Sequence, residues 1–485
     1  MALKVSTNYS SDFSRLISRY IESSGYSVYK ISQLTGLGRT AIHQVMSGKL
    51  VPTKTFFEQL CTVFQITPRQ KQELTELYLR EKIGSKLYYE QKRLTSIIEK
   101  LPQYYIDNEN SFITYDNNRI ESGVSIFGLL NVNRAVINIM SKETEKQEPR
   151  ICTTIPFENE SLFSLIIECL GKRDNKAVFE HYIRLYKSGE NLLKNNMDTL
   201  ENLLKMSINS GVTYKPYSYY VHEDAVDDAL SIFPYFLITS EYVILLTSDF
   251  QTAIITDKET VLQTASEHVN RLRSISSLMV EQIDNSRMFD IFINNSKYYF
   301  KSIEFQPCLT KYLTLDVIKE RLVDVPEKAE IIETLQRAFF AKADVEHTYY
   351  QQSVCYYSQK GLENFARTGM MLNMPGHLLT SFSVNERLSI LNEMKKDIGK
   401  NFKMLDSHNL QVPDFIQIIM LKNQKCLISC LMNKNKFCCI LSEQSLYSAF
   451  YEFINALDDR DFTLCDEESL KAVDKCIREL EVLSV

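Results

Sequence analysis

The stretch KISQLTGLGRTAIHQVMSGK, residues 30–49, decides how the N-terminal part of the chain folds. Its apolar residues Ile31, Ile42 and Val45 are spaced as on one face of a helix, before and after Gly36. Glycine suits a sharp turn because it takes a left-handed backbone conformation at little cost. The stretch therefore predicts two short helices joined by a tight turn, which is either a plain helical hairpin or a DNA-reading pair.

Apolar residues at helical spacing extend this region in both directions. Residues 12–24 predict a helix before the pair, and Ser27 can cap the first helix of the pair. Pro52 and Pro68 each stand where a further helix would begin. Five short helices within residues 1–82 predict a compact all-α domain.

Charge is unevenly spread along the chain. Residues 1–83 hold eleven Lys or Arg and six Asp or Glu, a balance of +5, whereas the whole chain carries −6. The remaining 402 residues therefore carry −11. A basic head on an acidic body is typical of a nucleic-acid-binding module joined to a soluble sensor, although a solvated surface can show the same excess.

The run of residues 27–49 resembles the Cro/repressor class of helix-turn-helix regulators, often called the Xre family. In that class a serine starts the second helix and a glycine nine residues later forms the turn, as Ser27 and Gly36 do here. A Ser-Gly-Lys or similar triplet follows the recognition helix, as at residues 47–49. The resemblance covers residues 12–80 and implies a domain that binds double-stranded operator DNA, usually as a homodimer.

In this class the recognition helix enters the major groove, and its first turn reaches the base edges. Arginine can bond two acceptors of guanine, glutamine can pair with adenine, and serine and lysine after the helix can hold phosphate. For each residue the alternative is a solvated surface side chain. By resemblance, base contacts fall to Arg39, Thr40 and Gln44, with His43 on the flank, and phosphate contacts fall to Ser47 and Lys49.

The chain departs from the class at two places. Many members have glutamine one residue into the second helix, where it touches phosphate, but this chain has Val28. Many also join the first helix to the end of the recognition helix with an Arg–Glu pair, where Ile21 and Met46 stand here. An apolar pair can replace a buried ion pair without loss of stability. The missing glutamine therefore bears on operator affinity more than on the fold.

Residues 83–101 predict a linker helix. Leu87, Leu94 and Leu101 are seven apart, with Gln91 and Ile98 at the intervening fourth positions. Two heptads are too few to establish a coiled coil, so a dimer seam stays the alternative to a plain linker.

Beyond residue 101 the pattern predicts a mixed α/β or α+β body in two sensor-like lobes, residues 102–290 and 291–485. Residues 234–257 favour two or three buried strands, and residues 177–208 favour helix. A shift of 185 residues lays positions 242–272 on 427–457 without a gap. This predicts two related lobes, and chance similarity of strand–strand–helix units is the alternative.

Known catalytic motifs are missing from the sequence. It has no G-x-S-x-G nucleophile turn, no phosphate-cradling G-x-x-x-x-G-K or G-x-G-x-x-G, and no two histidines four residues apart. We therefore expect a protein that is not an enzyme and needs no cofactor. The histidines are His43, His181, His222, His268, His347, His377 and His408.

Four cysteines form the best candidate metal site. Cys426, Cys430, Cys438 and Cys439 could hold zinc, but zinc ligands usually come in pairs two to four residues apart on knuckle turns. Cys438 and Cys439 would face opposite sides of a strand. Buried apolar cysteines are the preferred interpretation, and no metal is expected.

Several features favour a cytoplasmic protein. No uncharged apolar run reaches the length of a membrane span, and no secretory signal is visible at the N-terminus. The eleven cysteines, an odd number without regular spacing, fit reduced thiols.

The sequence as a whole predicts a sequence-specific DNA-binding transcriptional regulator. Its body would sense an unknown small molecule or protein effector, and two tyrosine-dense stretches, residues 214–224 and 346–357, could line a ligand pocket. The alternatives are an interaction scaffold with a helix-turn-helix head and, with less support from the sequence, an enzyme regulated by such a head.

Overall fold

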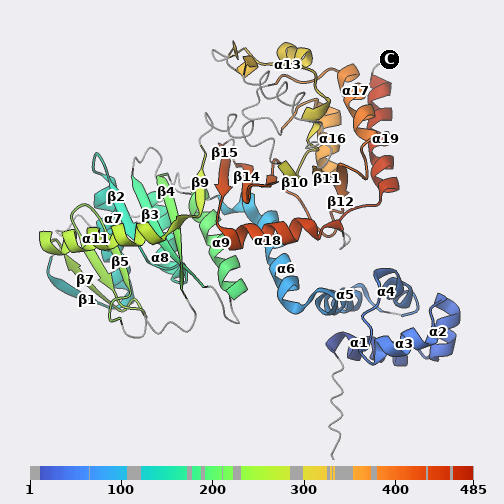
Figure 1. The fold of residues 1–485 in the computed structure, drawn as a ribbon, viewed down its shortest axis with the longest axis horizontal. Coiled ribbons are helices and arrows are strands. Elements are labelled where there is room, and N and C mark those ends of the chain that lie inside the picture. Colours follow the sequence, from blue (N-terminus) through green and yellow to red (C-terminus); the bar gives the residue numbers. More distant parts are fainter. Residues whose placement is uncertain are drawn as a thin grey trace, which may run out of the picture. The chain divides into compact units, whose positions relative to one another are not determined.

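The computed structural model forms two compact units, Met1–Arg93 and Leu94–Val485 (Figure 1). Several residues singled out in the sequence, such as His222, His347 and His377, lie outside the described part of the chain. The described residues are 11–64, 66–105, 122–171, 177–186, 192–209, 211–221, 231–283, 299–324, 328–329, 331–333, 353–372, 379–432, 435–458 and 462–483.

The first unit contains the predicted run of short helices. Ser27 accepts a hydrogen bond from the Lys30 amide at 3.2 Å, so it caps the second helix as predicted. Gly36 ends that helix with a left-handed φ of 73°, as the turn requires. The helices are α1 (Asp12–Ser23), α2 (Val28–Thr35), α3 (Arg39–Met46), α4 (Lys54–Cys61) and α5 (Pro68–Ile83).

One apolar cluster holds these helices together. Ile17, Ile31 and Ile42 are fully buried in it, and the predicted apolar pair Ile21 and Met46 packs in the same cluster. The α1 and α3 helices thus meet through methyl and thioether groups.

Helix α6 (Ser85–Lys100) covers most of the predicted linker. Leu94, Ile98 and Leu101 lie buried in the main apolar cluster of the second unit. Since these heptad positions are filled by the chain's own core, they are not available as the seam of a dimer.

The second unit contains two sheets. The first lobe, residues 122–278, has eight strands in the order β1-β7-β6-β5-β2-β3-β4-β8. Strands β2, β3 and β4 run parallel, and β5, β6 and β7 continue the sheet as antiparallel neighbours. Its elements are β1 (Val124–Phe127), α7 (Leu129–Thr144), β2 (Arg150–Thr153), α8 (Glu160–Leu170), β3 (Val178–Tyr186), α9 (Leu192–Asn209), β4 (Thr213–Val221), β5 (Tyr235–Ile238), β6 (Val243–Leu246), β7 (Thr252–Thr256), α11 (Glu259–Ile275) and β8 (Ser277–Leu278).

The second lobe, residues 280–483, has seven strands in the order β12-β11-β10-β13-β14-β15-β9. Strands β10, β11 and β12 run parallel, and β13, β14 and β15 are antiparallel neighbours. Its elements are β9 (Val280–Gln282), β10 (Tyr299–Glu304), η4 (Leu309–Tyr312), α13 (Leu315–Arg321), β11 (Val354–Ser358), α16 (Gln359–Thr368), α17 (Val384–Lys395), β12 (Phe402–Leu405), β13 (Gln417–Leu421), β14 (Lys425–Met432), β15 (Asn435–Leu441), α18 (Gln444–Asn455) and α19 (Asp466–Leu483).

The two sheets have the same topology. In each lobe three parallel strands lie beside an antiparallel three-stranded meander, and a further strand pairs with the far edge of that meander. Val243 of β6 and Ile428 of β14 are 185 positions apart. Following the paired residues across each sheet from this point leads to Lys215 of β4 and Lys403 of β12. Two positions further along these strands, Tyr217 pairs with Leu278 and Leu405 pairs with Thr463. Leu278 and Thr463 are again 185 apart. The repeat seen in the sequence therefore reflects two similarly folded lobes.

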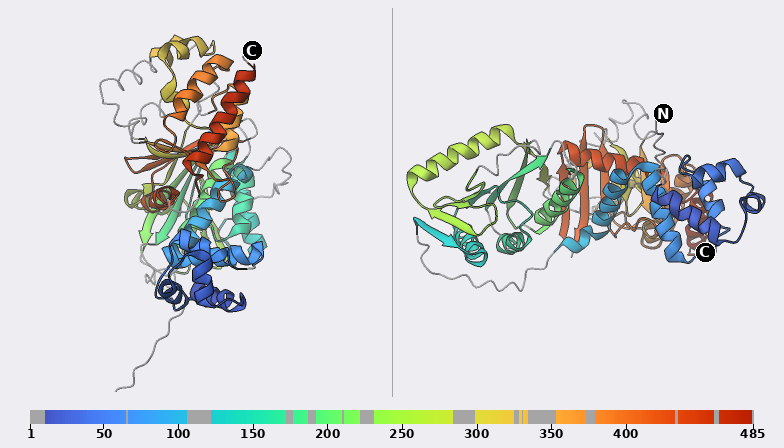
Figure 2. Two further views of the ribbon diagram at one scale, coloured as in Figure 1. Left: turned by 90° about the vertical axis from the view of Figure 1, so that its right-hand side faces the viewer. Right: turned by 90° about the horizontal axis from the view of Figure 1, so that it is seen from below.

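Both sheets carry helices on two faces, as Figure 2 shows. In the first lobe α11 packs on one face, whose buried residues include Tyr182, Ile238 and Val243. The opposite face contributes Phe179, Ile183 and Tyr214 to the main apolar cluster, together with residues of α7, α8 and α9.

Three sequence predictions are corrected by the fold. Residues 177–208 were predicted as helix, but Val178–Tyr186 form β3, in which the buried Phe179, Ile183 and Leu185 alternate with the half-buried Glu180 and Arg184. The polar stretch MSKETEKQEPR, residues 140–150, by itself predicts a surface loop, but α7 continues to Thr144 and buries Glu143. The second sheet begins at Val280, about ten positions before the predicted start of the second lobe at residue 291.

One extended segment, residues 277–283, belongs to both sheets. Its first residues pair with β4 at the edge of the first sheet, and the next ones pair with β15 at the edge of the second. The Ile283 amide also donates to the Cys438 carbonyl at 2.9 Å. The lobes are therefore joined at their edges by one continuous stretch of backbone.

Candidate nucleic-acid interface and a cavity in the second lobe

The predicted DNA-contacting residues share one exposed surface of the first unit. They lie on α3 and on the turn after it, while Ile42 and Val45 of the same helix are fully buried. This two-sidedness follows from the helical period, since residues three or four apart lie on one face. The exposed residues are Arg39, Thr40, His43, Gln44, Ser47 and Lys49.

Arg39 at the start of α3 lies against an aromatic side chain of α2. Its guanidinium carbon is 5.6 Å from the centre of the Tyr29 ring. The Tyr29 hydroxyl accepts a hydrogen bond from the Gln33 amide at 2.9 Å. Stacking restricts the arginine side chain without occupying its five N–H donors, so the residue is oriented before it meets a partner.

The turn after α3 is fixed by the carbonyl of Gln44. The Ser47 hydroxyl donates to it at 3.1 Å and the Lys49 amide at 2.9 Å. Gly48 takes a φ of 70°, which lets the chain reverse here. The hydrogen bond to Gln44 thus fixes the backbone of Lys49, while the side chain of Lys49 is exposed.

Apolar side chains are also exposed on this unit, which the sequence reasoning missed. Tyr26, Tyr29 and Leu34, in and just before α2, are 43%, 56% and 54% exposed. The helical spacing alone could have indicated this exposure, because Tyr29 and Leu34 are not on the face of α2 that buries Ile31. Such a group favours a protein contact or the apolar surface of a base or sugar.

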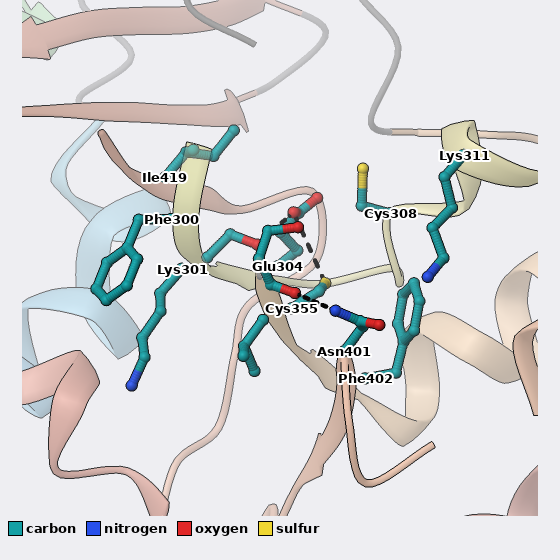
Figure 3. Close-up of a pocket in the computed structure, with 12 residues that line it drawn as sticks. Phe300, Lys301, Glu304, Cys308, Lys311, Cys355, Asn401, Phe402 and Ile419 are labelled. Atoms are coloured by element: carbon teal, nitrogen blue, oxygen red, sulfur yellow. Dashed lines mark hydrogen bonds between the residues drawn. The ribbon is translucent and has the colours of Figure 1, made fainter. Parts of the chain in front are cut away.

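A cavity of about 40 Å³ lies in the second lobe, beside β10, β11 and β12 (Figure 3). A single water needs roughly 10–15 Å³ by the same measure, so the cavity admits a group of a few non-hydrogen atoms. The sequence reasoning missed it. Of the tyrosine-dense stretch at 346–357, only residues 353–357 are described, and of these Ser353, Val354 and Cys355 line the cavity while Tyr356 and Tyr357 do not. The other lining residues are Phe300, Lys301, Ser302, Glu304, Cys308, Lys311, Asn401, Phe402 and Ile419.

Glu304 is the buried carboxylate of this cavity, only 2% exposed. The Ser302 hydroxyl donates to it at 2.7 Å and the Gln417 amide at 3.2 Å, and the Cys355 thiol lies at 3.7 Å. The Ser429 hydroxyl continues the chain by donating to the Gln417 side-chain oxygen at 3.1 Å. Burial raises the pKa of Glu304 even though these donors act to lower it.

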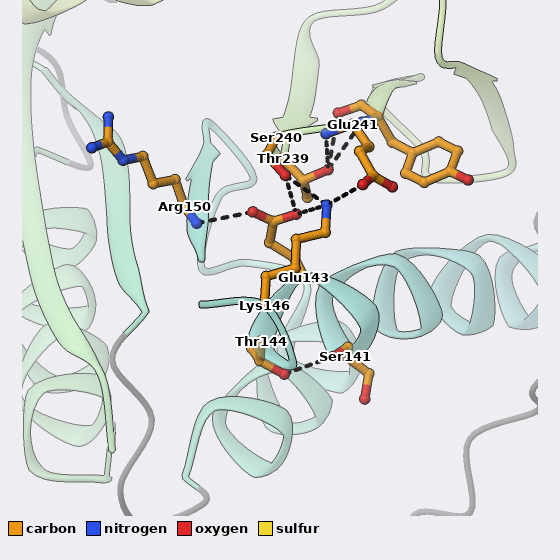
Figure 4. A network of polar contacts seen from close by, with 9 residues as sticks. Ser141, Glu143, Thr144, Lys146, Arg150, Thr239, Ser240 and Glu241 are labelled. Atoms are coloured by element: carbon orange, nitrogen blue, oxygen red, sulfur yellow. Dashed lines mark hydrogen bonds and ion pairs between the residues drawn. The ribbon is translucent and has the colours of Figure 1, made fainter. Parts of the chain in front are cut away.

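A second buried carboxylate, Glu143 of α7, has a different environment (Figure 4). Lys146 lies 2.9 Å from it, the Arg150 amide donates at 3.0 Å, and the Ser240 hydroxyl donates at 2.8 Å. Lys146 also pairs with Glu241 at 2.9 Å. A cation and a backbone amide therefore compensate the burial of Glu143, which joins the end of α7 to the adjoining strands.

The four clustered cysteines are buried in β14 and β15. Cys426, Cys430 and Cys439 lie in the main apolar cluster, whereas Cys438 lies in the cluster on the other face of the sheet, as predicted from strand alternation. Burial raises the pKa of Cys426 and of Cys439 well above the usual range. Since Cys438 lies on the face opposite to the other three, the four thiols do not converge on one point.

His181 is the buried histidine of the first lobe. Its Nε2 lies 2.8 Å from the Ile155 carbonyl and its Nδ1 lies 3.0 Å from the Tyr214 hydroxyl. The carbonyl can only accept, so Nε2 carries the proton and Nδ1 accepts from the tyrosine. Burial lowers the pKa of His181 to about 4, so the ring is neutral at pH 7 and serves packing.

The described residues provide neither a metal-binding cluster nor a membrane-spanning helix. No group of three or more His, Cys, Asp or Glu side chains there could hold a metal ion. None of the helices in that part of the chain is long and apolar enough to cross a membrane.

Neither a protein-family model nor a curated protein matches the chain. Among solved structures, a match is found to TrmBL2, an archaeal chromatin protein described as showing a novel mode of DNA binding. The match has a TM-score of 0.22 and 13% sequence identity, and it covers 55% of this chain and 100% of that chain. A score this low does not establish a common fold, and nothing about this chain is inferred from it.

Proposed function

We propose that this protein is a sequence-specific DNA-binding transcriptional regulator of the Xre type, which binds operator DNA through α3. The observation that carries the proposal is the exposed row of Arg39, Thr40 and Gln44 on a helix whose other face is fully buried. The resembled class uses these positions to read base edges in the major groove. The excess of positive charge in residues 1–83 supports an anionic partner.

The body, by this proposal, acts by binding rather than by catalysis. It would sense a small molecule or a protein and change the operator affinity of a homodimer in the cytoplasm. Two DNA-binding heads on half-sites one helical turn apart bind much more tightly than one.

The decisive experiment is recovery and sequencing of genomic fragments bound by the purified full-length protein. The complex with a recovered site should weaken by roughly 10³-fold or more between 50 and 200 mM salt, because phosphate contacts release counterions. A protein without a sequence-selective complex at any salt concentration would contradict the proposal.

Arg39→Ala tests the base-reading contact. It should reduce affinity for a recovered site by about 1–3 kcal/mol and relax the choice of base at one position. Lys49→Ala should weaken all sequences alike and lower the slope of affinity against salt. The matched control is Arg69→Ala, which removes the same charge from the exposed first turn of α5. Equal effects of Arg39→Ala and Arg69→Ala would show that α3 does not face the bases.

A second function, that of an interaction scaffold, is favoured by the exposed Tyr26, Tyr29 and Leu34. Leu34→Asp distinguishes the two functions. A scaffold should lose its partner with this change, because a charge replaces an apolar contact. A DNA reader should keep its base preference, which is measured with the same recovered fragments.

A further inference from the structure

One aromatic ring of the first unit lies against the side chain that we assign to base recognition. Tyr29 stands in the first turn of α2 and Arg39 is the first residue of α3, so the two lie on opposite sides of the turn between these helices. The guanidinium carbon of Arg39 lies over the Tyr29 ring, 5.6 Å from its centre. At this distance an aromatic face attracts a cation.

The turn between the two helices fixes how the pair meets. The Ser32 hydroxyl donates to the Leu37 carbonyl at 2.6 Å, and the Leu37 amide donates to the Thr35 hydroxyl at 3.3 Å. Buried isoleucines of both helices also pack in one apolar cluster. The backbones that carry the ring and the guanidinium group are therefore held together by contacts in which neither side chain takes part.

The Tyr29 ring is also held at its hydroxyl end. The side-chain amide of Gln33 donates to the Tyr29 hydroxyl at 2.9 Å. Residues four apart on a helix lie on the same face, so the two side chains meet without distortion of α2. Tyr29 nevertheless stays 56% exposed. Its ring is thus placed at the surface beside Arg39 and not in the core.

The stack leaves the hydrogen-bonding edge of Arg39 open. A guanidinium group is planar and its N–H donors point outward in that plane, whereas an aromatic ring occupies one face. Arg39 can therefore contact the ring and donate two hydrogen bonds to O6 and N7 of guanine at the same time. An arginine side chain that is already oriented by a ring loses less rotational freedom when it binds a base.

We propose that Tyr29 is a positioning residue for base recognition, and that the operator contains a G·C pair whose selection depends on the stack of Tyr29 with Arg39. The role of Tyr29 is to orient the guanidinium group, without a contact of its own to the base. This role rests on the proposed function, because Arg39 has to be the residue that reaches the base.

The test uses the full-length protein and the genomic fragments that it selects. Tyr29→Leu removes the aromatic face and keeps an apolar side chain of higher helix propensity, so α2 should form as before. At the base pair where Arg39→Ala relaxes the choice, the preference for guanine should fall by roughly two- to five-fold, as expected for the loss of one exposed cation–aromatic contact. The slope of affinity against salt should stay unchanged, because no cation is removed.

Two further variants separate the ring from its surroundings. Tyr29→Phe keeps the aromatic face and removes the hydroxyl, and it should keep most of the preference that Tyr29→Leu loses. The matched control is Tyr89→Leu in the same unit. It removes a tyrosine that is 51% exposed and whose ring centre lies 5.4 Å from the guanidinium carbon of Arg80, and it should leave the choice of base unchanged.

A double-mutant cycle tests whether Tyr29 acts through Arg39. In the Arg39→Ala background, Tyr29→Leu should cause no further change at that base pair, since no guanidinium group is left to orient. A further loss of preference in this background would mean that Tyr29 contacts the DNA itself, and it would overturn the positioning role.

Two more results would overturn the proposal and leave the proposed function intact. These are an unchanged preference for guanine in Tyr29→Leu, as a tyrosine that serves a protein contact would give, and an equal loss in Tyr89→Leu. A wild-type protein without a sequence-selective complex would contradict both proposals. Circular dichroism checks that each variant is folded. Should Tyr29→Leu fail to fold, Tyr29→Gln, which also lacks an aromatic face, takes its place.

Discussion

Leu237 and Gln417 occupy corresponding positions in two sheets of the same strand order, and their surroundings differ completely. Leu237 is fully buried among apolar residues of the first lobe. Gln417 lies between the carboxylate of Glu304 and the hydroxyl of Ser429. The difference shows that the same strand order and register can hold either apolar or polar side chains at these positions. The polar residues of the second lobe are therefore not required for this fold. The following predictions test this view.

The largest effect should come from placing a second-lobe residue in the first lobe. Leu237→Gln buries an amide among methyl groups without a partner, and we expect it to lower the free energy of unfolding by about 3–5 kcal/mol. Urea denaturation followed by circular dichroism measures this. Leu237→Met, which conserves apolar character and volume, is the control and should cost less than about 1.5 kcal/mol. If Leu237→Gln lowered the free energy of unfolding only slightly, the core of the first lobe would also tolerate a polar side chain.

Acid should affect the two lobes in opposite directions. The pKa of His181 is about 4 in the folded protein and 6.5 in a free histidine. Between these two pH values the unfolded chain binds a proton at this histidine and the folded chain does not. The free energy of unfolding is therefore unaffected by His181 above about pH 6.5 and decreases as pH falls towards 4. At pH 5 the loss is about 2 kcal/mol. The raised pKa of Glu304 has the reverse sign, because protonation removes an unfavourable buried charge.

The measurement compares urea denaturation at pH 7 and pH 5 for the wild-type protein and for His181→Gln. In His181→Gln, the decrease in the free energy of unfolding between pH 7 and pH 5 should be smaller by most of the amount attributed to the histidine. An unchanged pH dependence in His181→Gln would assign acid sensitivity to other groups.

The smallest effect should come from placing first-lobe residues in the second lobe. The fourfold substitution Ser302→Ile, Glu304→Thr, Gln417→Leu and Ser429→Ile, which introduces the whole first-lobe set, should change the free energy of unfolding by less than about 1 kcal/mol, or increase it. The corresponding first-lobe residues, found by following the paired strands, are Ile151, Thr153, Leu237 and Ile244. The single substitution Gln417→Leu should instead cost about 1–3 kcal/mol, since it removes a hydrogen-bond partner of Glu304 and of Ser429. A fourfold variant that is much less stable than the wild-type protein would show that the polar set holds the lobe together.

The sequence predicted the head more fully than the body. Helices α1 to α5 follow from local signals, namely apolar spacing, the caps Ser27 and Thr53, and Gly36 at the turn. The shift of 185 residues indicated the two lobes, because strand–strand–helix order is also local. Strand β3 was predicted as helix because its residues were taken together with the helical run that follows, although Phe179, Ile183 and Leu185 alternate with the charged Glu180 and Arg184.

The cavity could not be predicted from the sequence. Glu304 stands between Ile303 and Phe305 in a strand, so a charged residue among buried ones was visible. Its meaning depends on Gln417, which is 113 positions away and meets Glu304 only through the pairing of β10 with β13. Contacts between distant strands are set by tertiary packing, on which single-residue patterns carry no information.

Because the segment 277–283 pairs with both sheets, neither lobe can be expressed alone without losing a strand or carrying an unpaired one. A fragment that begins after Ile283 would strip β15 of its outer neighbour and leave its amides and carbonyls open to pairing with other chains. A fragment that ends after Ile283 would keep the first lobe but carry an apolar strand, β9, without the strand with which it pairs. Fragments made from either half should therefore aggregate.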